Sequence, residues 1–178
     1  IQFYVETAQE ALDTTIQAFK IAENHTVSTP VMVCLDGFNI SHAEEIVEIP
    51  DQDKVDNFLP PFSRSVVLDP DNPLIIDVGA MGRLTGVWRF EQIQAMEAAK
   101  KVIEDVDKEF GKVFGRSYGG LVDTYECEDA EVTVVGMGGL ACGATRDAVD
   151  SMRNNGVRAG MLRLRSFRPF PNELVRQH

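Results

Sequence analysis

The sequence predicts an α/β protein, because the segment from 131 to 168 has the pattern of a βαβ unit. A β-branched run from Val132 to Val135 ends in a glycine turn, and apolar residues at helical spacing follow as far as Asn155. Gly156 ends that helix, and a second apolar run extends from Val157 to Leu164. Such a crossover joins parallel strands, so we expect a sheet covered by helices around it.

The glycine turn of this unit matches a cofactor-binding pattern only in part. Gly136-x-Gly138-x-x-Ala141 has the spacing of the dinucleotide fingerprint that ends in alanine. The fingerprint also needs an acid at the end of the second strand, where this chain has Arg163, Arg165 and Ser166. We interpret the glycines as a tight turn into a closely packed helix, with a bound dinucleotide as the open alternative.

Composition describes a globular chain with a strong negative charge. The net charge is −11, which argues against nucleic acid or an anionic membrane as a partner. The first 128 residues hold 10 basic and 23 acidic residues, whereas the part from Asp129 onward holds 7 basic and 5 acidic residues. This asymmetry indicates two regions, the second suited to docking on an acidic surface.

The sequence contains no pattern that predicts a metal site or a membrane segment. The three cysteines and three histidines are scattered without a C-x-x-C pair, so we predict no disulfide framework, metal site or iron–sulfur site. No apolar run approaches the roughly 20 residues of a membrane helix, and we expect a cytoplasmic protein. The chain begins at Ile1 and stops inside a predicted helix, Asn172 to His178, so we expect a piece of a longer protein.

The amino-terminal elements are predicted as strand, helix and strand. The alternating run Gln2 to Val5 is followed by Thr7-x-x-Glu10, a capping box. Leu12, Ile16 and Phe19 then recur at helical spacing, which predicts an amphipathic helix that ends near Asn24. The apolar run Val31 to Leu35 predicts a parallel strand covered on both faces.

A candidate functional loop follows that second strand. Ser41-x-x-Glu44 repeats the capping spacing, which places the loop between the strand and a new helix. Ligands of parallel sheets bind at the carboxyl ends of strands. The candidate residues are therefore Asp36, Gly37, Phe38, Ser41 and His42. A capping serine and a solvated histidine would explain two of them without any ligand.

The middle of the chain is predicted to form a linker followed by a long helix. Five prolines punctuate residues 46–77, with a short helix predicted at Asp51 to Leu59, and Gly79, Gly82 and Gly86 extend this linker. A narrow apolar seam then predicts an amphipathic helix from near Trp88 to Gly111, before a glycine-rich turn.

Several stretches, taken in order, resemble the alpha-type subunit of 2-oxoacid:ferredoxin oxidoreductases, in particular the pyruvate:ferredoxin oxidoreductase or pyruvate synthase type. The run D-G-F-x-x-S-H is the most distinctive, and the resemblance covers essentially the whole chain. The stretches are Pro30-Val-Met-Val-Cys-Leu-Asp-Gly-Phe-Asn-Ile-Ser-His42, Leu68-Asp-Pro-Asp-Asn-Pro73, Ala95-Met-Glu-Ala-Ala-Lys-Lys-Val-Ile103, Val134-Val-Gly-Met-Gly138 and Leu162-Arg-Leu-Arg-Ser-Phe-Arg-Pro-Phe-Pro171.

The resemblance implies a domain layout. Residues 1–61 look like the end of a thiamine-pyrophosphate pyrimidine-binding domain, and residues 62–129 form a linker and a long amphipathic helix. Residues 130–178 look like part of a Rossmann-like parallel-sheet domain similar to the transketolase carboxyl-terminal domain.

The resemblance also implies the chemistry of the assembled enzyme. It implies oxidative decarboxylation of a 2-oxoacid to acyl-CoA and CO2, or the reverse. Cofactors would carry that chemistry: thiamine pyrophosphate with Mg2+, [4Fe-4S] clusters in partner subunits or domains, and coenzyme A as cosubstrate. Ferredoxin and the other subunits would be partners. The family's catalytic glutamate and cluster ligands are not in this chain, so no catalytic residue is assigned and the piece alone is expected to be inactive.

A second reading belongs to a different class. The chain would then be a non-catalytic Rossmann-like module that binds a nucleotide at the Gly136 turn or serves assembly.

Three arginines near the end of the chain predict a docking surface. In a strand, Leu162 and Leu164 point to one side and Arg163 and Arg165 to the other. Unpaired buried charges are costly, so these arginines and Arg168 must meet water, an anion or acidic protein. We expect domain or subunit docking through Arg–carboxylate pairs, with a phosphate or coenzyme A site as the alternative.

Overall fold

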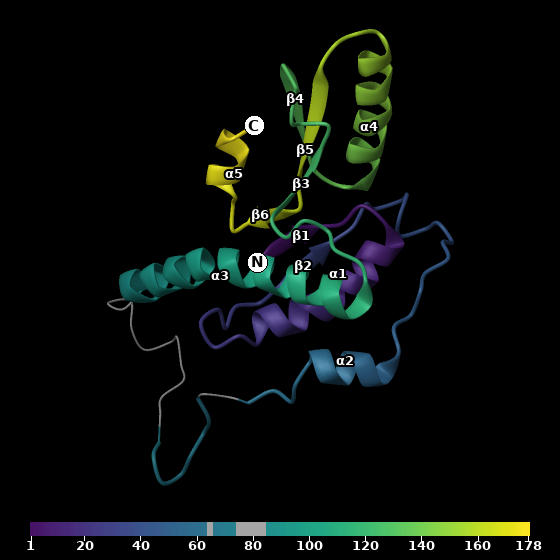
Figure 1. Ribbon diagram of the computed structural model, residues 1–178. Coiled ribbons are helices and arrows are strands. Elements are labelled where there is room, and N and C mark those ends of the chain that lie inside the picture. Colours follow the sequence, from purple (N-terminus) through teal and green to yellow (C-terminus); the bar gives the residue numbers. More distant parts are fainter. Residues whose placement is uncertain (64–65, 74–84) are drawn as a thin grey trace.

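The computed structural model describes residues 1–63, 66–73 and 85–178 and confirms the α/β class (Figure 1). Part of the predicted linker, including Gly79 and Gly82, lies outside the described residues. The elements, in chain order, are β1 (Gln2–Tyr4), α1 (Ala8–Ala22), β2 (Met32–Cys34), α2 (Gln52–Phe58), α3 (Thr85–Phe114), β3 (Val122–Tyr125), β4 (Val132–Gly136), α4 (Gly139–Asn154), β5 (Ala159–Leu164), β6 (Ser166–Arg168) and α5 (Asn172–Arg176).

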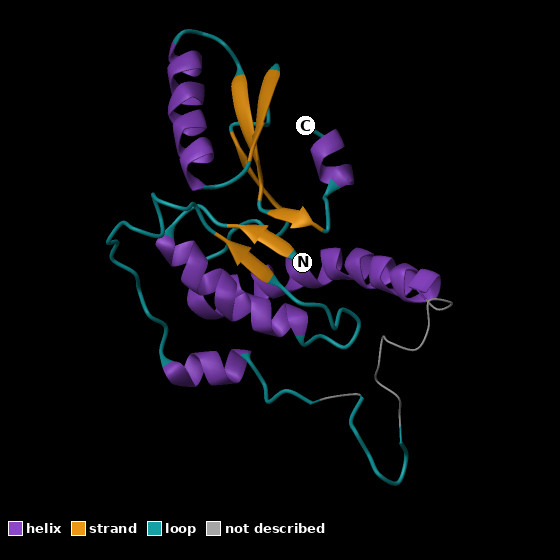
Figure 2. Ribbon diagram, turned by 180° about the vertical axis from the view of Figure 1, so that it is seen from behind, coloured by secondary structure: helices purple, strands orange, loops and turns teal. Residues whose placement is uncertain are grey.

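The first sheet has the strand order β2-β1-β6, and α1 and α3 lie on one side of it (Figures 1 and 2). β1 and β2 are parallel, so their carboxyl ends lie at one edge. The main apolar core lies between these helices and the sheet, and α2 closes it through Phe58. Its buried members are Ile1, Phe3, Ile21, Val27, Phe58, Ala99, Ile103, Val106, Phe110 and Leu121.

The second sheet contains the predicted βαβ unit. β4 and β5 are parallel, with Val134 opposite Met161, and α4 packs against them over Cys142, Val149, Ala159 and Met161. The sheet is mixed rather than purely parallel, because β3 adds to β5 in the antiparallel direction. The sequence pattern missed β3, a four-residue strand, Val-Asp-Thr-Tyr, in which two polar residues are adjacent and no apolar alternation marks the strand.

The two sheets are joined by a continuous stretch of chain. β5 belongs to the second sheet and β6 to the first, with Arg165 alone between them. The Tyr4 N–H donates to the Arg165 carbonyl at 2.8 Å, and the Arg165 N–H donates to the Leu121 carbonyl at 3.1 Å. Backbone hydrogen bonds therefore fix the relative position of the sheets.

The predicted amphipathic helix is α1, but its predicted apolar face is only partly buried: Ile16 packs against the main core and Phe19 does not. Thr7 does cap the helix, since its hydroxyl accepts from the Glu10 N–H at 3.1 Å. The buried residues, however, are mainly polar, whereas Phe19 is 56% exposed. The helix carries two stripes, and the polar one is buried because the arginines that it meets are themselves buried. The buried residues of α1 are Glu10, Asp13, Thr14, Gln17, Ala18 and Ile21, of which the first four form the polar stripe.

Two expectations around β2 are also corrected. The strand is not covered on both faces in the described part of the chain, because it is an edge strand and Met32 is 53% exposed. No helix begins after Ser41, since the described backbone stays irregular until α2. The Ser41 hydroxyl contacts its neighbour His42 at 2.7 Å instead, and a side chain used locally in this way does not cap a helix.

The other predicted helices are confirmed within a few residues. The helix expected from Trp88 to Gly111 is α3, the one expected at Asp51 to Leu59 is α2, and the final one is α5. The second half of α3 packs in the core, while its first turns project from the body (Figure 1). Among the described residues, no helix combines the length and apolar character needed to cross a membrane.

Candidate functional site

The candidate loop leaves the carboxyl edge of the parallel pair β1 and β2. The Val5 N–H donates to the Cys34 carbonyl at 3.0 Å, which holds the exit of both strands together. Beyond this point Gly37, Phe38, Ser41 and His42 are all exposed, with Phe38 at 74%. Exposed residues at the carboxyl ends of parallel strands are expected where a loop of such a sheet binds a ligand.

His42 is oriented by its own loop. Its Nδ1 lies 2.7 Å from the Ser41 hydroxyl, and its ring stacks on Phe38 with centroids 5.4 Å apart. The His42 N–H also donates to the Phe38 carbonyl at 3.1 Å, closing the turn. Because Ser41 engages Nδ1, Nε2 is the second ring nitrogen of this exposed side chain.

Asp36 reaches the glycine turn, where Ile40 of the same loop also lies. Its Oδ2 accepts a hydrogen bond from the Leu140 N–H, in the first turn of α4, at 2.7 Å. A Cβ at Gly139 would lie 2.7 Å from the Glu6 carbonyl oxygen and 3.0 Å from Asp36 Oδ2. Gly138 has a φ of 85°, and a Cβ there would lie 3.1 Å from Asp36 Oδ1. The glycines thus give room to a carboxylate from the first sheet.

This contact bears on the dinucleotide alternative. A dinucleotide places its pyrophosphate on the N–H groups at the start of such a helix. Here that end of α4 already holds the Asp36 carboxylate. We therefore predict that titrating the full-length subunit with NAD or NADP gives no saturable binding by calorimetry, with a known NAD-dependent dehydrogenase as the positive control. A nucleotide seated on Gly136 to Ala141 in a crystal would contradict this prediction.

Arg163 and Arg165 lie fully buried against one carboxylate of α1. Arg163 holds Glu10 with both terminal nitrogens, at 2.7 and 3.1 Å, and Arg165 Nε donates to the same carboxylate at 2.9 Å. Burial opposes the charge of Arg163, but its hydrogen bonds to Glu10 and the neighbouring acids raise its pKa above the usual value. Arg165 also donates to Thr14 at 2.9 Å and to the Gly120 carbonyl at 2.8 Å.

Arg168 is separate from this pair. It is exposed at the end of β6, where it borders a surface cavity of about 380 Å3. The structure brings Arg163 and Arg165 together and leaves Arg168 outside their cluster. The cavity is lined by Ile93, Met96, Glu97, Phe167, Arg168, Pro169, Phe170 and Asn172.

A second charged group extends the buried cluster. Asp13 accepts from Arg116 Nε at 2.6 Å and from the Tyr118 hydroxyl at 2.6 Å. Burial, followed by the hydrogen bond to Asp13, raises the pKa of Tyr118 far above its ordinary value, so this phenol stays neutral. Sequence reasoning missed these residues, although Glu10, Asp13 and Gln17 recur at helical spacing and mark a polar stripe.

Cys142 lies beside the glycine turn but is not a candidate nucleophile. A Cβ at Gly136 would lie 3.2 Å from its sulfur. Burial, and then the charge of Glu6, raise the pKa of this thiol to about 11. The thiolate is the reactive form, so this cysteine is inert at neutral pH.

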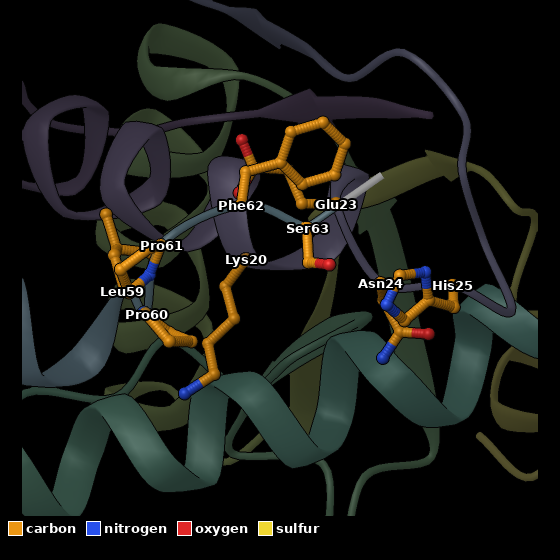
Figure 3. Close-up of a pocket in the computed structure, with 9 residues that line it drawn as sticks. All are labelled: Lys20, Glu23, Asn24, His25, Leu59, Pro60, Pro61, Phe62 and Ser63. Carbon is orange, nitrogen blue, oxygen red and sulfur yellow. The ribbon is translucent and has the colours of Figure 1, made fainter. Parts of the chain in front are cut away.

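Another cavity, of about 250 Å3, lies between the end of α1 and the segment after α2 (Figure 3). Lys20 stands at its centre between Leu59–Pro61 and the pair Asn24 and His25. The Lys20 amine is already bound to the Phe58 carbonyl at 2.9 Å and to Glu109 at 2.6 Å. Since this charge is neutralised and no residue of the candidate loop lines the cavity, we assign it no function.

In the described part of the chain, no group of three or more His, Cys, Asp or Glu residues is arranged to hold a metal ion.

Comparison with known proteins gives two family matches along the chain. Residues 1–108 match the sequence model of the family described as pyruvate flavodoxin/ferredoxin oxidoreductase, thiamine diP-bdg. Residues 130–178 match the one described as pyruvate:ferredoxin oxidoreductase core domain II.

Curated relatives align with nearly the whole chain. Pyruvate synthase subunit PorA of Methanothermobacter thermautotrophicus is 43% identical over 99% of this chain and 45% of its own length. PorA of Methanosarcina barkeri is 45% identical over 98% of this chain and 43% of its own. Ketoisovalerate oxidoreductase subunit VorA of Pyrococcus horikoshii is 41% identical over 97% and 43%. The chain thus spans less than half the length of these relatives.

Proposed function

The chain belongs to the pyruvate flavodoxin/ferredoxin oxidoreductase family, and from this premise we propose that it is part of a 2-oxoacid:ferredoxin oxidoreductase of the pyruvate synthase type. The observation that carries the proposal is the succession of two family matches, the first a thiamine-diphosphate-binding family and the second core domain II. Relatives named PorA support pyruvate as the substrate. Because another relative, VorA, is named as a ketoisovalerate oxidoreductase subunit, the identity of the 2-oxoacid is a separate part of the proposal.

The proposed reaction is oxidative decarboxylation of pyruvate to acetyl-CoA and CO2 with electrons passed to ferredoxin, or the reverse, in the cytoplasm. Thiamine pyrophosphate supplies the carbon acid that makes decarboxylation possible. Its Mg2+ and diphosphate ligands, the [4Fe-4S] clusters and most of the coenzyme A site would come from other parts of the enzyme.

We assign this chain a positioning and assembly role. Residues 1–61 would end the pyrimidine-binding domain, residues 62–129 would connect, and residues 130–178 would begin the transketolase-like domain. The loop Asp36 to His42 would border the active site, supported by its exposure at the carboxyl edge of β1 and β2. Arg163, Arg165 and Arg168 would serve docking, supported for the first two by their contacts with Glu10.

The proposal is tested on the native complex that contains this subunit. A visible absorption spectrum and a thiamine assay are expected to give brown iron–sulfur absorbance and stoichiometric thiamine. Comparing kcat/KM for pyruvate and 2-oxoisovalerate then decides the substrate. A colourless, thiamine-free complex would instead favour a non-catalytic Rossmann-like module.

Replacing His42 with alanine tests whether the loop borders the active site. We expect kcat/KM to fall about tenfold to a hundredfold in the assembled enzyme, because a hydrogen bond from one imidazole to a charged or polarised substrate is lost. The measurement is steady-state turnover with the 2-oxoacid, with size-exclusion chromatography to verify assembly.

The matched control is His25→Ala, which removes an exposed histidine at the end of α1, outside the loop. It is expected to leave turnover unchanged. If His42→Ala and this control have the same kinetics, His42 is a solvated surface residue that has no role in turnover.

A further inference from the structure

We propose that Asp36 is a positioning residue that anchors the candidate loop to the second sheet, and that the glycine turn at the start of α4 is built to receive its carboxylate. This inference deepens the proposed function and rests on it, since it explains how a loop beside the active site is held in place. It also gives the glycine pattern a role other than binding a dinucleotide.

The first support is the contact itself. Asp36 Oδ2 and the Leu140 N–H are 2.7 Å apart and join residues 104 positions apart in the sequence. A carboxylate at a helix N-terminus makes a charge-assisted hydrogen bond and is favoured by the helix dipole. The bond therefore links the loop after β2 to the helix that packs on β4 and β5.

The second support is the shape of the turn. At Gly139 a side chain would collide with the Glu6 carbonyl oxygen, 2.7 Å away, before it reached Asp36. At Gly138 a Cβ would crowd the other carboxylate oxygen, and the φ of 85° already disfavours any residue other than glycine. Both glycines are thus explained by the close approach of the first sheet, without a nucleotide.

The third support is a parallel contact at the end of β1. Arg146, near the middle of α4, pairs with Glu6 and donates to Asp123 at 2.9 Å. Glu6 follows β1 and Asp36 follows β2, so α4 is held over both strand ends at the same edge of the first sheet (Figures 1 and 2). Arg146 fixes where the helix lies, and Asp36 fixes the loop on it.

The consequence for the loop is directional. Asp36 is the first residue of the loop and is fixed by its hydrogen bond to Leu140. Phe38, Ser41 and His42 follow it in the loop and are exposed. When Asp36 is anchored, the loop that carries His42 begins at a fixed position. Without it, the segment after the loop is still held to α1, through hydrogen bonds of Glu45 to Ala8 and of Glu48 to Gln9. The start of the loop is released, however, and the ring of His42 samples more positions.

The experiment compares Asp36→Ala and Asp36→Asn in the full-length subunit, assembled in its complex. Hydrogen–deuterium exchange is measured for peptides covering residues 36–44 and 139–143, and kcat and KM are measured with the 2-oxoacid. We expect Asp36→Ala to speed exchange about tenfold in both peptides and to lower kcat about tenfold, with thiamine content unchanged. Asp36→Asn keeps an acceptor oxygen without the charge, so both effects should be smaller.

Two further variants make the test specific. Asp53→Asn, at an exposed acid in the first turn of α2, is expected to change neither exchange nor turnover. Gly139→Ala crowds both the Glu6 carbonyl and the Asp36 carboxylate, so it is expected to speed exchange in both peptides at least as much as Asp36→Ala.

Unchanged exchange in either peptide overturns the anchoring, even in an enzyme that uses thiamine. Faster exchange with unchanged kcat and KM overturns the positioning role. Failure of the proposed function has a different signature, the lack of thiamine and iron–sulfur absorbance in the wild-type complex.

Discussion

Replacing Glu10 with alanine is expected to lower the free energy of unfolding by about 3–5 kcal/mol, because it leaves buried charges without their partner. Glu10 is 1% exposed, and the two arginines that share its carboxylate are equally inaccessible. The Glu10 carboxylate also accepts from the Glu6 N–H at 2.9 Å. Urea denaturation of the full-length subunit, followed by circular dichroism, measures the change.

Glu91→Ala is the control for this substitution, since Glu91 is an exposed glutamate on α3. It should change the free energy of unfolding by no more than about 0.5 kcal/mol. Glu10→Gln should give an intermediate loss, because the amide oxygen can still accept from one arginine. If Glu10→Ala were as stable as the control, the buried arginines would have to draw their compensation from Glu6, Asp107 and Asp123 instead.

Replacing Phe110 with alanine is expected to cost a similar amount, about 3–5 kcal/mol, through lost apolar burial and the cavity left behind. Phe110 is fully buried, and its ring lies 5.5 Å from that of Phe58 and 4.3 Å from that of Phe114. Because Phe58 is the buried residue of α2, this helix should detach first. Urea denaturation gives the energy, and limited proteolysis between α2 and the core reports the detachment.

Phe90→Ala is the matched control for Phe110, on the projecting part of the same helix. Phe90 is 59% exposed, so its loss should be within about 0.5 kcal/mol in the isolated subunit. Equal losses for the two variants would mean that the aromatic cluster at the end of α3 is not a principal source of stability.

Most of the regular structure could be predicted because its local signals agree. In the βαβ unit, the β-branched run, the glycine turn and the Gly156 stop all indicate the same boundaries, and α4 and β5 follow them within two residues. β3 and β6 could not be predicted in this way. Each has four residues or fewer, and each forms only because a distant strand, β5 or β1, offers it backbone partners.

The burial of the polar stripe of α1 has a physical cause that no helical period reveals. Period identifies two stripes on the helix, and hydrophobicity alone favours burying Leu12, Ile16 and Phe19. The structure buries Glu10 and Asp13, because Arg163, Arg165 and Arg116 supply their charge partners from elements more than 100 residues away. Which stripe is buried is therefore decided by tertiary pairing.

The candidate site was located by the same local rules, but its connections were not. Strand position predicts that Asp36 and His42 lie at the carboxyl edge of the sheet, which is where they are found. The Ser41 spacing failed because the hydroxyl bonds the adjacent imidazole. The contact between Asp36 and Leu140 joins two motifs that sequence treats separately, and only their arrangement in space relates them.

The pairing of β1 with β6 delays the completion of the first sheet during biosynthesis. Gln2 lies opposite Arg168, so β1 pairs with a strand that follows it by 166 residues, from 2 to 168. At a translation rate of about 5–20 residues per second, β1 leaves the ribosome roughly 8–30 s before β6 exists. During that interval β1 has a bare edge that can pair with other nascent chains. Slow codons between the two strands should lengthen this exposure and raise the need for chaperones, without altering any contact of the finished protein.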